Sequence, residues 1–365
     1  MLFQSGDLTL HKAHPIIAAV LAFMAVVPPT LDAAPIVSEP DANGFRWSTV
    51  GSPGNAAYPG SPLGAMAGRG SVPYTFGIAQ TEITTAQWME FLNTFGGQSD
   101  AMAAFAMPLR WGAELAPGAP GTPFQWQLKN IPDAAQLPVG GMSWRTAAYY
   151  SNWLHHGKPT TFAAIQSGAY DASTFTNNPD GTFNDQLTRS PGAKYWIPSL
   201  DEWIKAVHFD PDRYGSSKPG WWTYPNTSDT ALIPGPPGVG QTTAGWRPPQ
   251  IEAEWLIPLG AYPDVLSPFG LLDASGGVTE WTEEALSFIE GWPPIDRMTD
   301  GAWAGAQNAE VSDLLYAGAY SIPPRSRDSL VGFRVASSFT VPSPTGSIMI
   351  LTPLVSGVGI RRRNL

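Results

Sequence analysis

The 365-residue chain contains no cysteine, and charged residues make up only 14% of it, against roughly 25% in an average soluble domain. Without cysteine the chain cannot form a disulfide, a thiolate nucleophile, a zinc finger or an iron–sulfur cluster. Basic residues are also few, because 20 Lys and Arg stand against 30 Asp and Glu and give a net charge of −10. A nucleic-acid partner normally requires a basic surface, so this composition argues against one.

Glycine and proline are abundant, with 38 and 37 residues that together make up about a fifth of the chain. Average usage of the two is roughly 12%, so many turns and short elements are expected. Hydrophobic residues nevertheless make up 43% of the chain and aromatic residues 12%, which is enough for a large core. There is no internal repeat and no alternation of strands and helices, so we predict one α+β domain rather than a doubly wound sheet.

The first 34 residues have the features of a secretory signal peptide. Lys12 precedes an apolar run over residues 16–27, and the small-residue stretch 32–34 follows it. A basic region, a short apolar region and a small-residue cleavage site define such a peptide, and we place the cleavage near Ala33. The run is shorter than the roughly 20 apolar residues of a membrane span. A buried or membrane-anchoring helix is the alternative.

The last residues, 339–365, are predicted to be a sorting or anchoring tail. Val341-Pro-Ser-Pro344 is followed by a mostly apolar stretch, 346–360, and then by three arginines. This pattern resembles the bacterial PEP-CTERM sorting tail, although Ser343 stands where that tail has Glu. A C-terminal strand with a basic end is the alternative. The two ends predict an exported bacterial protein of the periplasm, the cell envelope or the medium, with transient or permanent membrane contact through the tail.

Three helices and two strands are predicted between these ends. Residues 35–72 form an N-terminal segment with one possible strand at 45–50, and a second strand is expected over 76–83. Two helices are predicted to begin with a capping box, one at Thr84 with Gln87 and one at Ser199 with Glu202. A third helix is predicted to begin at Ser143. The polar segment 167–190 is interpreted as a loop with a turn, because no acid falls at the last position of an EF-hand calcium loop.

Five short sequence motifs follow one another along the chain. They are 76–95 with E-I-T-T-A-Q-W, 137–153 with P-V-G-G-M-S-W, 195–203 with Y-W-I-P-S-L-D-E-W, 267–281 with G-L-L-D-A-S-G-G-V-T-E-W, and 332–336 with G-F-R-V-A. They resemble the motifs of the formylglycine-generating enzyme family, also called the sulfatase-modifying factor family. The resemblance implies a single irregular α+β domain over residues 73–338, related in fold to C-type lectins, with little regular secondary structure and Gly/Pro-rich loops.

The chemistry of that family does not carry over to this chain. Formylglycine-generating enzymes oxidise a substrate cysteine with oxygen and use two copper-binding cysteines before the closing Gly-Phe-Arg. By resemblance the corresponding stretch is 316–320, which lacks the arginine that opens the family's motif, and the chain has no cysteine. Thiolates are the ligands that make a copper(I) site, so we expect neither copper nor formylglycine formation.

The resemblance also implies a structural calcium ion. In the family the segment matching 273–280 wraps calcium with two side chains and two backbone carbonyls. The corresponding residues are Asp273 and Glu280 for the side chains, and Gly276 and Val278 for the carbonyls. Oxygen ligands of this kind suit a hard cation. Gly277 stands where the family has Asn, and the alternative is that both acids are ordinary loop carboxylates.

Other catalytic sites are left open by the sequence. A related branch of the family uses three histidines to bind iron, and the body of this chain has only His155, His156 and His208. The first two are adjacent and would point about 100° apart on a helix, so surface or helix-end positions are the alternative. A serine hydrolase would lack the Gly-x-Ser-x-Gly elbow. A glycosidase needs two carboxylates about 5 to 10 Å apart, which a sequence does not reveal.

Aromatic residues suggest where a ligand could bind. Most of the 15 tryptophans fall in family motifs and are expected in the core, whereas Trp221 and Trp222 lie in a Pro/Gly-rich stretch. The predicted ligand pocket comprises Tyr316, Tyr320, Arg325, Arg327, Trp221 and Trp222. The leading hypothesis is an exported, non-catalytic family member that acts as a binding or structural module for a protein or glycan at the cell surface. The alternative is a metal-dependent oxidoreductase of the same fold with an unidentified active site.

Overall fold

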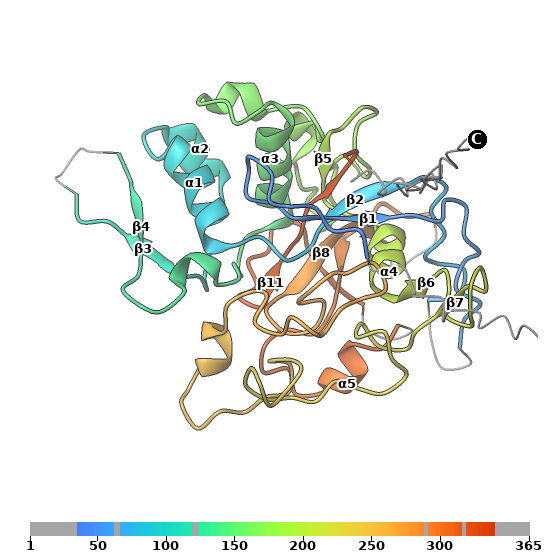
Figure 1. The fold of residues 1–365 in the computed structure, drawn as a ribbon. Coiled ribbons are helices and arrows are strands. Elements are labelled where there is room, and N and C mark those ends of the chain that lie inside the picture. Colours follow the sequence, from blue (N-terminus) through green and yellow to red (C-terminus); the bar gives the residue numbers. More distant parts are fainter. Residues whose placement is uncertain (1–34, 62–65, 119–122, 288–290, 316–318, 340–365) are drawn as a thin grey trace, which may run out of the picture. The chain divides into compact units, whose positions relative to one another are not determined.

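The computed structural model describes residues 35–61, 66–118, 123–287, 291–315 and 319–339. The predicted signal peptide and sorting tail lie outside these residues, apart from Phe339. Within the described ranges no helix is long and apolar enough to cross a membrane. Figure 1 shows an irregular arrangement of short helices and strands joined by long loops, as the glycine and proline content predicts.

Two four-stranded sheets organise the domain. The first has the order β1 (Trp47–Val50), β2 (Phe76–Ala79), β12 (Ala336–Ser337) and β5 (Tyr195–Trp196), and all its pairs are antiparallel. It therefore joins both ends of the domain, because β12 near the C-terminus lies between two strands from the first 200 residues. The strand predicted over 45–50 is confirmed as β1, and the one predicted over 76–83 is shorter and ends at Ala79.

The second sheet carries the motif-rich C-terminal part. Its order is β10 (Tyr320–Ile322), β9 (Asp296–Asp300), β8 (Thr279–Leu286) and β11 (Val331–Gly332). The β8–β9 pair is antiparallel and is interrupted by an irregularity between Trp281 and Ala285, whereas β11 pairs with β8 in parallel. The sequence motifs predict a calcium-binding segment at the start of β8 but do not predict this sheet.

Three helices begin where the capping signals place them. They are α1 (Thr85–Phe95), α3 (Trp144–His155) and α4 (Leu200–His208), and both predicted capping boxes are present. Two short helices were not predicted, α2 (Ser99–Ala104) and α5 (Ala309–Ser312). Both are at most six residues long and have no side-chain cap, so they leave little signal in the sequence.

An aromatic part of the core lies between α1, α3 and the segment that follows β11. Trp88 on α1 stacks on Tyr150 of α3 with ring centroids 5.3 Å apart, and Phe333 meets Trp88 edge-on at 5.9 Å. The predicted apolar stripe of α1 is fully buried: Trp88, Phe91, Leu92 and Phe95. The closing Gly-Phe-Arg motif therefore contributes its phenylalanine to the same core as the first helix.

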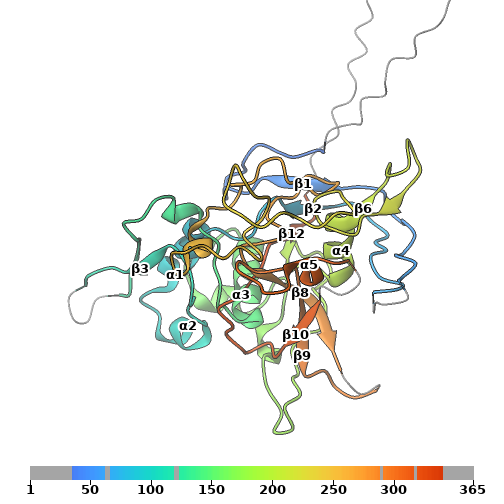
Figure 2. The same ribbon diagram turned by 90° about the horizontal axis from the view of Figure 1, so that it is seen from below.

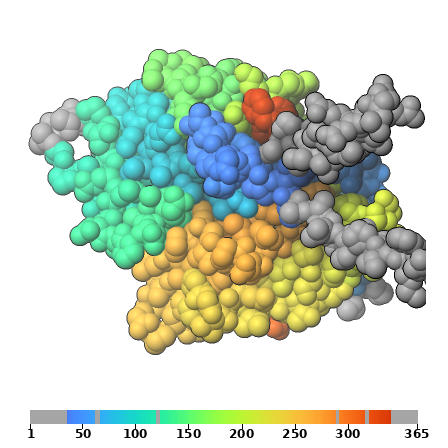
Figure 3. All heavy atoms as spheres, in the orientation of Figure 1, coloured from blue at the N-terminus to red at the C-terminus, as the bar shows by residue number. Residues whose placement is uncertain are grey.

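Two hairpins lie at the periphery of the domain. One pairs β3 (Ala113–Leu115) with β4 (Trp126–Leu128), and it extends away from α1 in both Figure 1 and Figure 2. The other pairs β6 (Phe209–Asp210) with β7 (Gly220–Trp221) directly after α4. The irregular segment between β7 and β8, yellow to orange in Figure 3, covers one side of the domain with few regular elements; these include the 3-10 helix Ala253–Leu256.

Candidate functional site

The predicted calcium-binding segment is a tight loop that leads into β8. Asp273, Gly276 and Gly277 all have positive φ angles, of 53°, 91° and 60°. A side chain at Gly276 would approach Thr243 Oγ1 to 2.6 Å, and one at Gly277 would approach Glu82 Oε1 to 2.6 Å. The Gly-Gly pair is therefore required both by its left-handed backbone and by the lack of space around it.

Glu280 forms a buried ion pair with the arginine of the closing motif. Both carboxylate oxygens accept hydrogen bonds from Arg334, at 2.6 Å from Nε and 2.6 Å from Nη2. Trp203 on α4 donates a further bond to Glu280 from Nε1, at 3.0 Å. Both partners are buried, so this bidentate pair joins β8 to the last segment of the domain in a low-dielectric environment.

Glu82, from the first family motif, reaches the same buried region. Its Oε1 accepts the backbone N–H of Val278 at 3.0 Å, whereas its Oε2 is buried without a hydrogen-bond partner. Burial first, and then the neighbouring charges of Glu280 and Asp273, raise the pKa of Glu82 well above its ordinary value. The raised pKa favours the protonated form of Glu82, because burial and the two neighbouring carboxylates oppose a further negative charge there.

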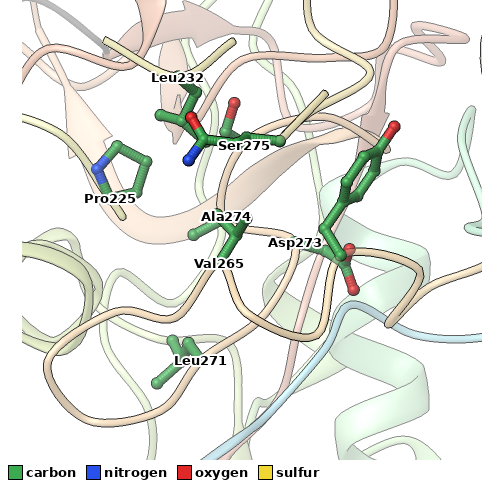
Figure 4. Close-up of a pocket in the computed structure, with 9 residues that line it drawn as sticks. Pro225, Leu232, Val265, Leu271, Asp273, Ala274 and Ser275 are labelled. Atoms are coloured by element: carbon green, nitrogen blue, oxygen red, sulfur yellow. The ribbon is translucent and has the colours of Figure 1, made fainter. Parts of the chain in front are cut away.

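Asp273 lies beside a small internal cavity. Its Oδ2 accepts the backbone N–H of Gly260 at 2.7 Å, and burial raises the pKa of its carboxyl to about 6. Figure 4 shows Asp273, Ala274 and Ser275 along this cavity, together with apolar side chains such as Leu232. The cavity volume is about 10 Å³, which is close to the space that one water molecule needs.

These contacts constrain the predicted calcium site. The two acids that it requires approach the same arginine: Arg334 binds both oxygens of Glu280, and its Nη2 donates to the carbonyl of Asp273 at 3.3 Å. A calcium ion bound by Glu280 would have to share that carboxylate with a guanidinium. Among the described residues no group of three or more His, Asp and Glu side chains is placed to hold a metal ion. Calcium binding by Asp273, Gly276, Val278 and Glu280 stays a prediction.

A buried acidic pair in the same part of the fold was missed in the sequence. Burial, together with the nearby charge of Asp313, raises the pKa of Asp300, at the end of β9, to about 8. The pKa of Asp313 is raised to about 7 by burial, although it accepts a 2.6 Å bond from Ser275 Oγ. The only sequence signal was an acid next to glycine in Asp300-Gly301, which is also common in surface turns.

A second buried ion network joins α4 to β8. Arg189 donates to Glu202 at 2.9 Å and to Glu283 at 3.1 Å, and its guanidinium lies 4.1 Å from the ring centroid of Trp196. Burial raises the pKa of Glu283 to about 7. Glu202 also completes the capping box of α4, so this network anchors the start of that helix.

His155 and His156 lie together at the end of α3, with ring centroids 4.8 Å apart, whereas His208 lies at the end of α4. His156 is the C-cap residue of α3, and the neighbouring His155 accepts the backbone N–H of Lys194 at 3.1 Å. His208, the last residue of α4, is buried rather than exposed, and its Nδ1 lies 3.2 Å from the carbonyl of Trp222. Burial lowers the pKa of His208 to about 3, so its ring is neutral.

The polar loop 167–190 contains the predicted turn. Asn177 and Phe183 form an antiparallel bridge, and the backbone N–H of Asn178 donates to the carbonyl of Thr182 at 2.8 Å. Asp180 accepts from both the N–H and the hydroxyl of Thr182, at 3.0 and 2.7 Å. The Asp180 carboxylate therefore stabilises the turn by hydrogen bonds within it, which agrees with the prediction that this segment is a loop with a turn.

The predicted ligand-pocket residues occupy several places. Tyr316 lies outside the described residues. Tyr320 on β10 packs edge-on against Trp303, with centroids 5.7 Å apart, and its hydroxyl contacts Ser312. Arg325 is exposed, and Arg327 donates to the carbonyl of Met107 at 2.6 Å.

Trp221 and Trp222 belong to hairpin β6–β7 instead of a free loop, and both are half-buried. Trp222 donates from Nε1 to Asp210 at 2.9 Å. Trp221 lines a groove of about 630 Å³, which we call the β6–β7 groove. The groove is formed by Ala56, Ala57, Tyr58, Pro59, Phe209, Arg213, Tyr214, Pro219, Gly220, Trp221, Thr223 and Asp229.

The fold and the buried Glu280–Arg334 pair define an irregular α+β domain closed by its Gly-Phe-Arg segment. Residues 63–339, about three quarters of the chain, match the family described as Sulfatase-modifying factor enzyme 1-like domain. The chain therefore belongs to the sulfatase-modifying factor (FGE-sulfatase) family, as the five motifs predicted. No curated protein matches the sequence.

Solved structures with a similar fold have low sequence identity to this chain. CarF is 17% identical, with a TM-score of 0.43 over 80% of this chain and 98% of CarF. Treponema denticola variable protein 1 is 17% identical, with a TM-score of 0.45 over 84% of this chain and 99% of that protein. PvdO from Pseudomonas aeruginosa is 14% identical, with a TM-score of 0.44 over 84% of this chain and 99% of PvdO. The family assignment depends on the sequence match over residues 63–339.

Proposed function

We propose that this chain is an exported, non-catalytic member of the sulfatase-modifying factor family that acts as a binding or structural module at the bacterial cell envelope. The observation that carries the proposal is the absence of cysteine from all 365 residues of a chain that belongs to this family. By resemblance, the family's oxidation of a substrate cysteine depends on a pair of thiolates that bind copper. Without cysteine the chain has no thiolate that could form such a pair.

The pairing of two buried acids, Glu280 and Glu283, also supports a non-catalytic role. Glu280 is bound to Arg334 and Trp203, and Glu283 is bound to Arg189, so each acid already has strong partners. A general acid or base must reach a proton on a substrate, within about 3 Å or through one water molecule. Carboxylates that are buried and fully paired in this way stabilise the fold and are poorly placed for that task.

The proposal is tested by assaying the purified exported chain for metal and for cysteine oxidation. The chain is incubated with a cysteine-containing peptide, copper(I) and oxygen, beside a cysteine-bearing formylglycine-generating enzyme as positive control. We expect no aldehyde by mass spectrometry and no stoichiometric copper or iron by elemental analysis. Aldehyde formation, or a stoichiometric transition metal together with oxygen consumption, would contradict the proposal and favour an oxidoreductase.

We further propose, by resemblance, that calcium binds near Asp273 and has a structural role. An ion that binds only the folded state raises the melting temperature as its concentration increases. We expect the purified chain to melt higher with calcium than with a chelator, and the Asp273→Asn variant to lose this difference. An equal melting temperature with and without chelator in the unsubstituted chain would contradict calcium binding.

A further inference from the structure

We infer that the β6–β7 groove is a binding site for a neutral carbohydrate chain. The inference names the ligand class of the proposed binding module, and in that sense it depends on the proposed function. The groove has a volume of about 630 Å³, within the range of about 300–1,000 Å³ that is typical of ligand pockets. Its lining combines aromatic rings with a small number of polar side chains.

The groove is held in shape before any ligand arrives. Phe209 and Trp221 are opposite each other on β6 and β7, and their ring centroids are 5.1 Å apart. In the connecting loop, Asp212 accepts the backbone N–H of Ser217 at 2.6 Å. Gly220 lies against Tyr214 so closely that an added side chain would come within 2.6 Å of that ring. A preformed site avoids the entropy cost of ordering a loop upon binding.

Aromatic rings provide surfaces on which a sugar ring can stack. Tyr214 is 64% exposed, although it packs against the backbone of the hairpin. The Trp221 ring lies so close to Gly70 that no side chain would fit there, and Tyr58 meets it edge-on with centroids 5.8 Å apart. Aromatic faces bind the apolar C–H faces of ligands, and rings that are already immobilised lose little entropy when they do so.

One end of the lining presents fixed polar groups. Asp229 accepts from the backbone N–H and the hydroxyl of Thr223, at 3.1 and 2.8 Å, and it also contacts Arg213. The Arg213 guanidinium lies 4.4 Å from the ring centroid of Trp222 and 5.0 Å from that of Tyr214. Partial burial opposes ionisation of Asp229, but the bonds from Thr223 and the charge of Arg213 outweigh it and lower the pKa of Asp229.

These polar groups favour a polyhydroxylated ligand over a proline-rich peptide. An ionised carboxylate only accepts hydrogen bonds, so Asp229 favours a ligand that donates them. A hydroxyl group both donates and accepts hydrogen bonds. The hydroxyls of one ligand can therefore donate to Asp229 and accept from the remaining N–H groups of Arg213. A polyproline segment offers carbonyl acceptors and almost no donors.

The charges in the groove favour a neutral ligand. Arg213 and Asp229 carry opposite charges and are in direct contact, so this end of the groove has no net charge. The whole chain carries a net charge of −10, which repels acidic polymers. A neutral oligosaccharide is the ligand class that satisfies both the aromatic surfaces and the balanced polar pair.

The inference is tested with the full exported chain and a panel of neutral hexasaccharides, namely cellohexaose, laminarihexaose, maltohexaose, mannohexaose and chitohexaose. We expect at least one of them to give saturable heat in calorimetric titration and to change tryptophan fluorescence. Tyr214→Ala should weaken this binding about tenfold or more, and Asp229→Asn should also weaken it. A tenfold loss corresponds to about 1.4 kcal/mol.

Trp292→Ala is the matched control, because Trp292 is an aromatic residue of similar exposure, 61%, that does not line the groove. It should bind the same hexasaccharide with unchanged affinity, and all three variants should keep the melting temperature within experimental error. The inference is overturned if no hexasaccharide in the panel binds, if Tyr214→Ala binds normally, or if decaproline competes for the groove. Each of these outcomes leaves the metal and cysteine-oxidation assays unaffected, so failure of the carbohydrate site is separable from failure of the non-catalytic role.

Discussion

At the scale of single residues, Arg334 joins a buried carboxylate and several backbone carbonyls. It is fully buried, it binds both oxygens of Glu280, and it donates to the backbone carbonyls of Ala79 and Gln80. We expect Arg334→Met to destabilise the domain by about 3–5 kcal/mol, because the buried Glu280 then loses its partner. Chemical denaturation followed by tryptophan fluorescence measures this change.

Arg46→Met is the matched control for Arg334. Arg46 pairs with Glu39 at 3.4 Å, but its side chain is half exposed and that of Glu39 is almost fully exposed. Exposed ion pairs contribute at most about 1 kcal/mol, so this variant should unfold almost like the unsubstituted chain. If the two methionine variants lost similar stability, the buried pair would not have the importance assigned to it.

The buried acids predict a pH dependence of stability. Asp300 and Asp313 have pKa values of about 8 and 7 in the folded chain, whereas an unfolded aspartate titrates near about 3.9. The folded state therefore retains protons that the unfolded state releases. This contribution to stability is fully present below about pH 4 and is lost as the pH rises through 7 and 8.

We expect the free energy of unfolding to fall by at least about 1 kcal/mol between about pH 5 and pH 8.5. Asp300→Asn keeps an oxygen that can accept the N–H of Gly301, which Oδ1 of Asp300 accepts at 2.8 Å, but it cannot ionise. This variant should lose part of the pH dependence and become relatively more stable at high pH. Denaturation curves at several pH values measure it, and a slope equal to that of the unsubstituted chain would count against the assignment.

At the scale of elements, the turn before β8 depends on Gly277. Its φ of 60° is unfavourable for a side chain, and a Cβ atom would meet the Glu82 carboxylate at 2.6 Å. We expect Gly277→Ala to destabilise the domain by about 1–3 kcal/mol, through backbone strain and displacement of a buried carboxylate together.

Gly238→Ala separates these two causes. Gly238 has a φ of 81°, but no atom lies within 4 Å of the position of an added Cβ. It should therefore show only the cost of the backbone conformation, about 1 kcal/mol. Thermal or chemical unfolding of the two variants side by side gives the difference. Equal losses would mean that the close approach of Glu82 to the turn has no energetic effect.

A sequence predicts well those helices and strands whose signals are local. Helices α1 and α4 were located from Thr84 with Gln87 and Ser199 with Glu202, because a capping box is complete within four residues. The strands β8 and β9 are not predicted by the sequence, because neither T-E-W-T-E-E-A-L in β8 nor D-R-M-T-D in β9 alternates apolar and polar residues. Their pairing is fixed by packing against the rest of the domain.

At the scale of the whole molecule, export and processing are the remaining predictions. Residues 1–34 and 340–365 lie outside the described structure, so the signal peptide and the sorting tail depend on sequence patterns alone. We expect the mature protein from a native host to begin near Ala34, because the small residues around Ala33 fit a cleavage site. Mass spectrometry of the intact protein measures both ends. An N-terminus at Met1 in the mature protein would contradict the signal peptide.

The sequence by itself determined the family, the starts of three helices and the absence of cysteine. These features depend on local patterns or on composition: a cap with its partner, an ordered set of short motifs, and a residue type that is absent. None of them requires knowledge of which distant segments meet in space.

Only the tertiary structure decided which polar groups act together. Glu280 and Arg334 are 54 residues apart, and Glu82 approaches Val278 across 196 residues. The β6–β7 groove likewise combines residues 56–59 with the hairpin and with Asp229. Such contacts form because chain segments that bury apolar surface bring their polar groups with them, and in a low-dielectric interior each of those groups then needs a partner.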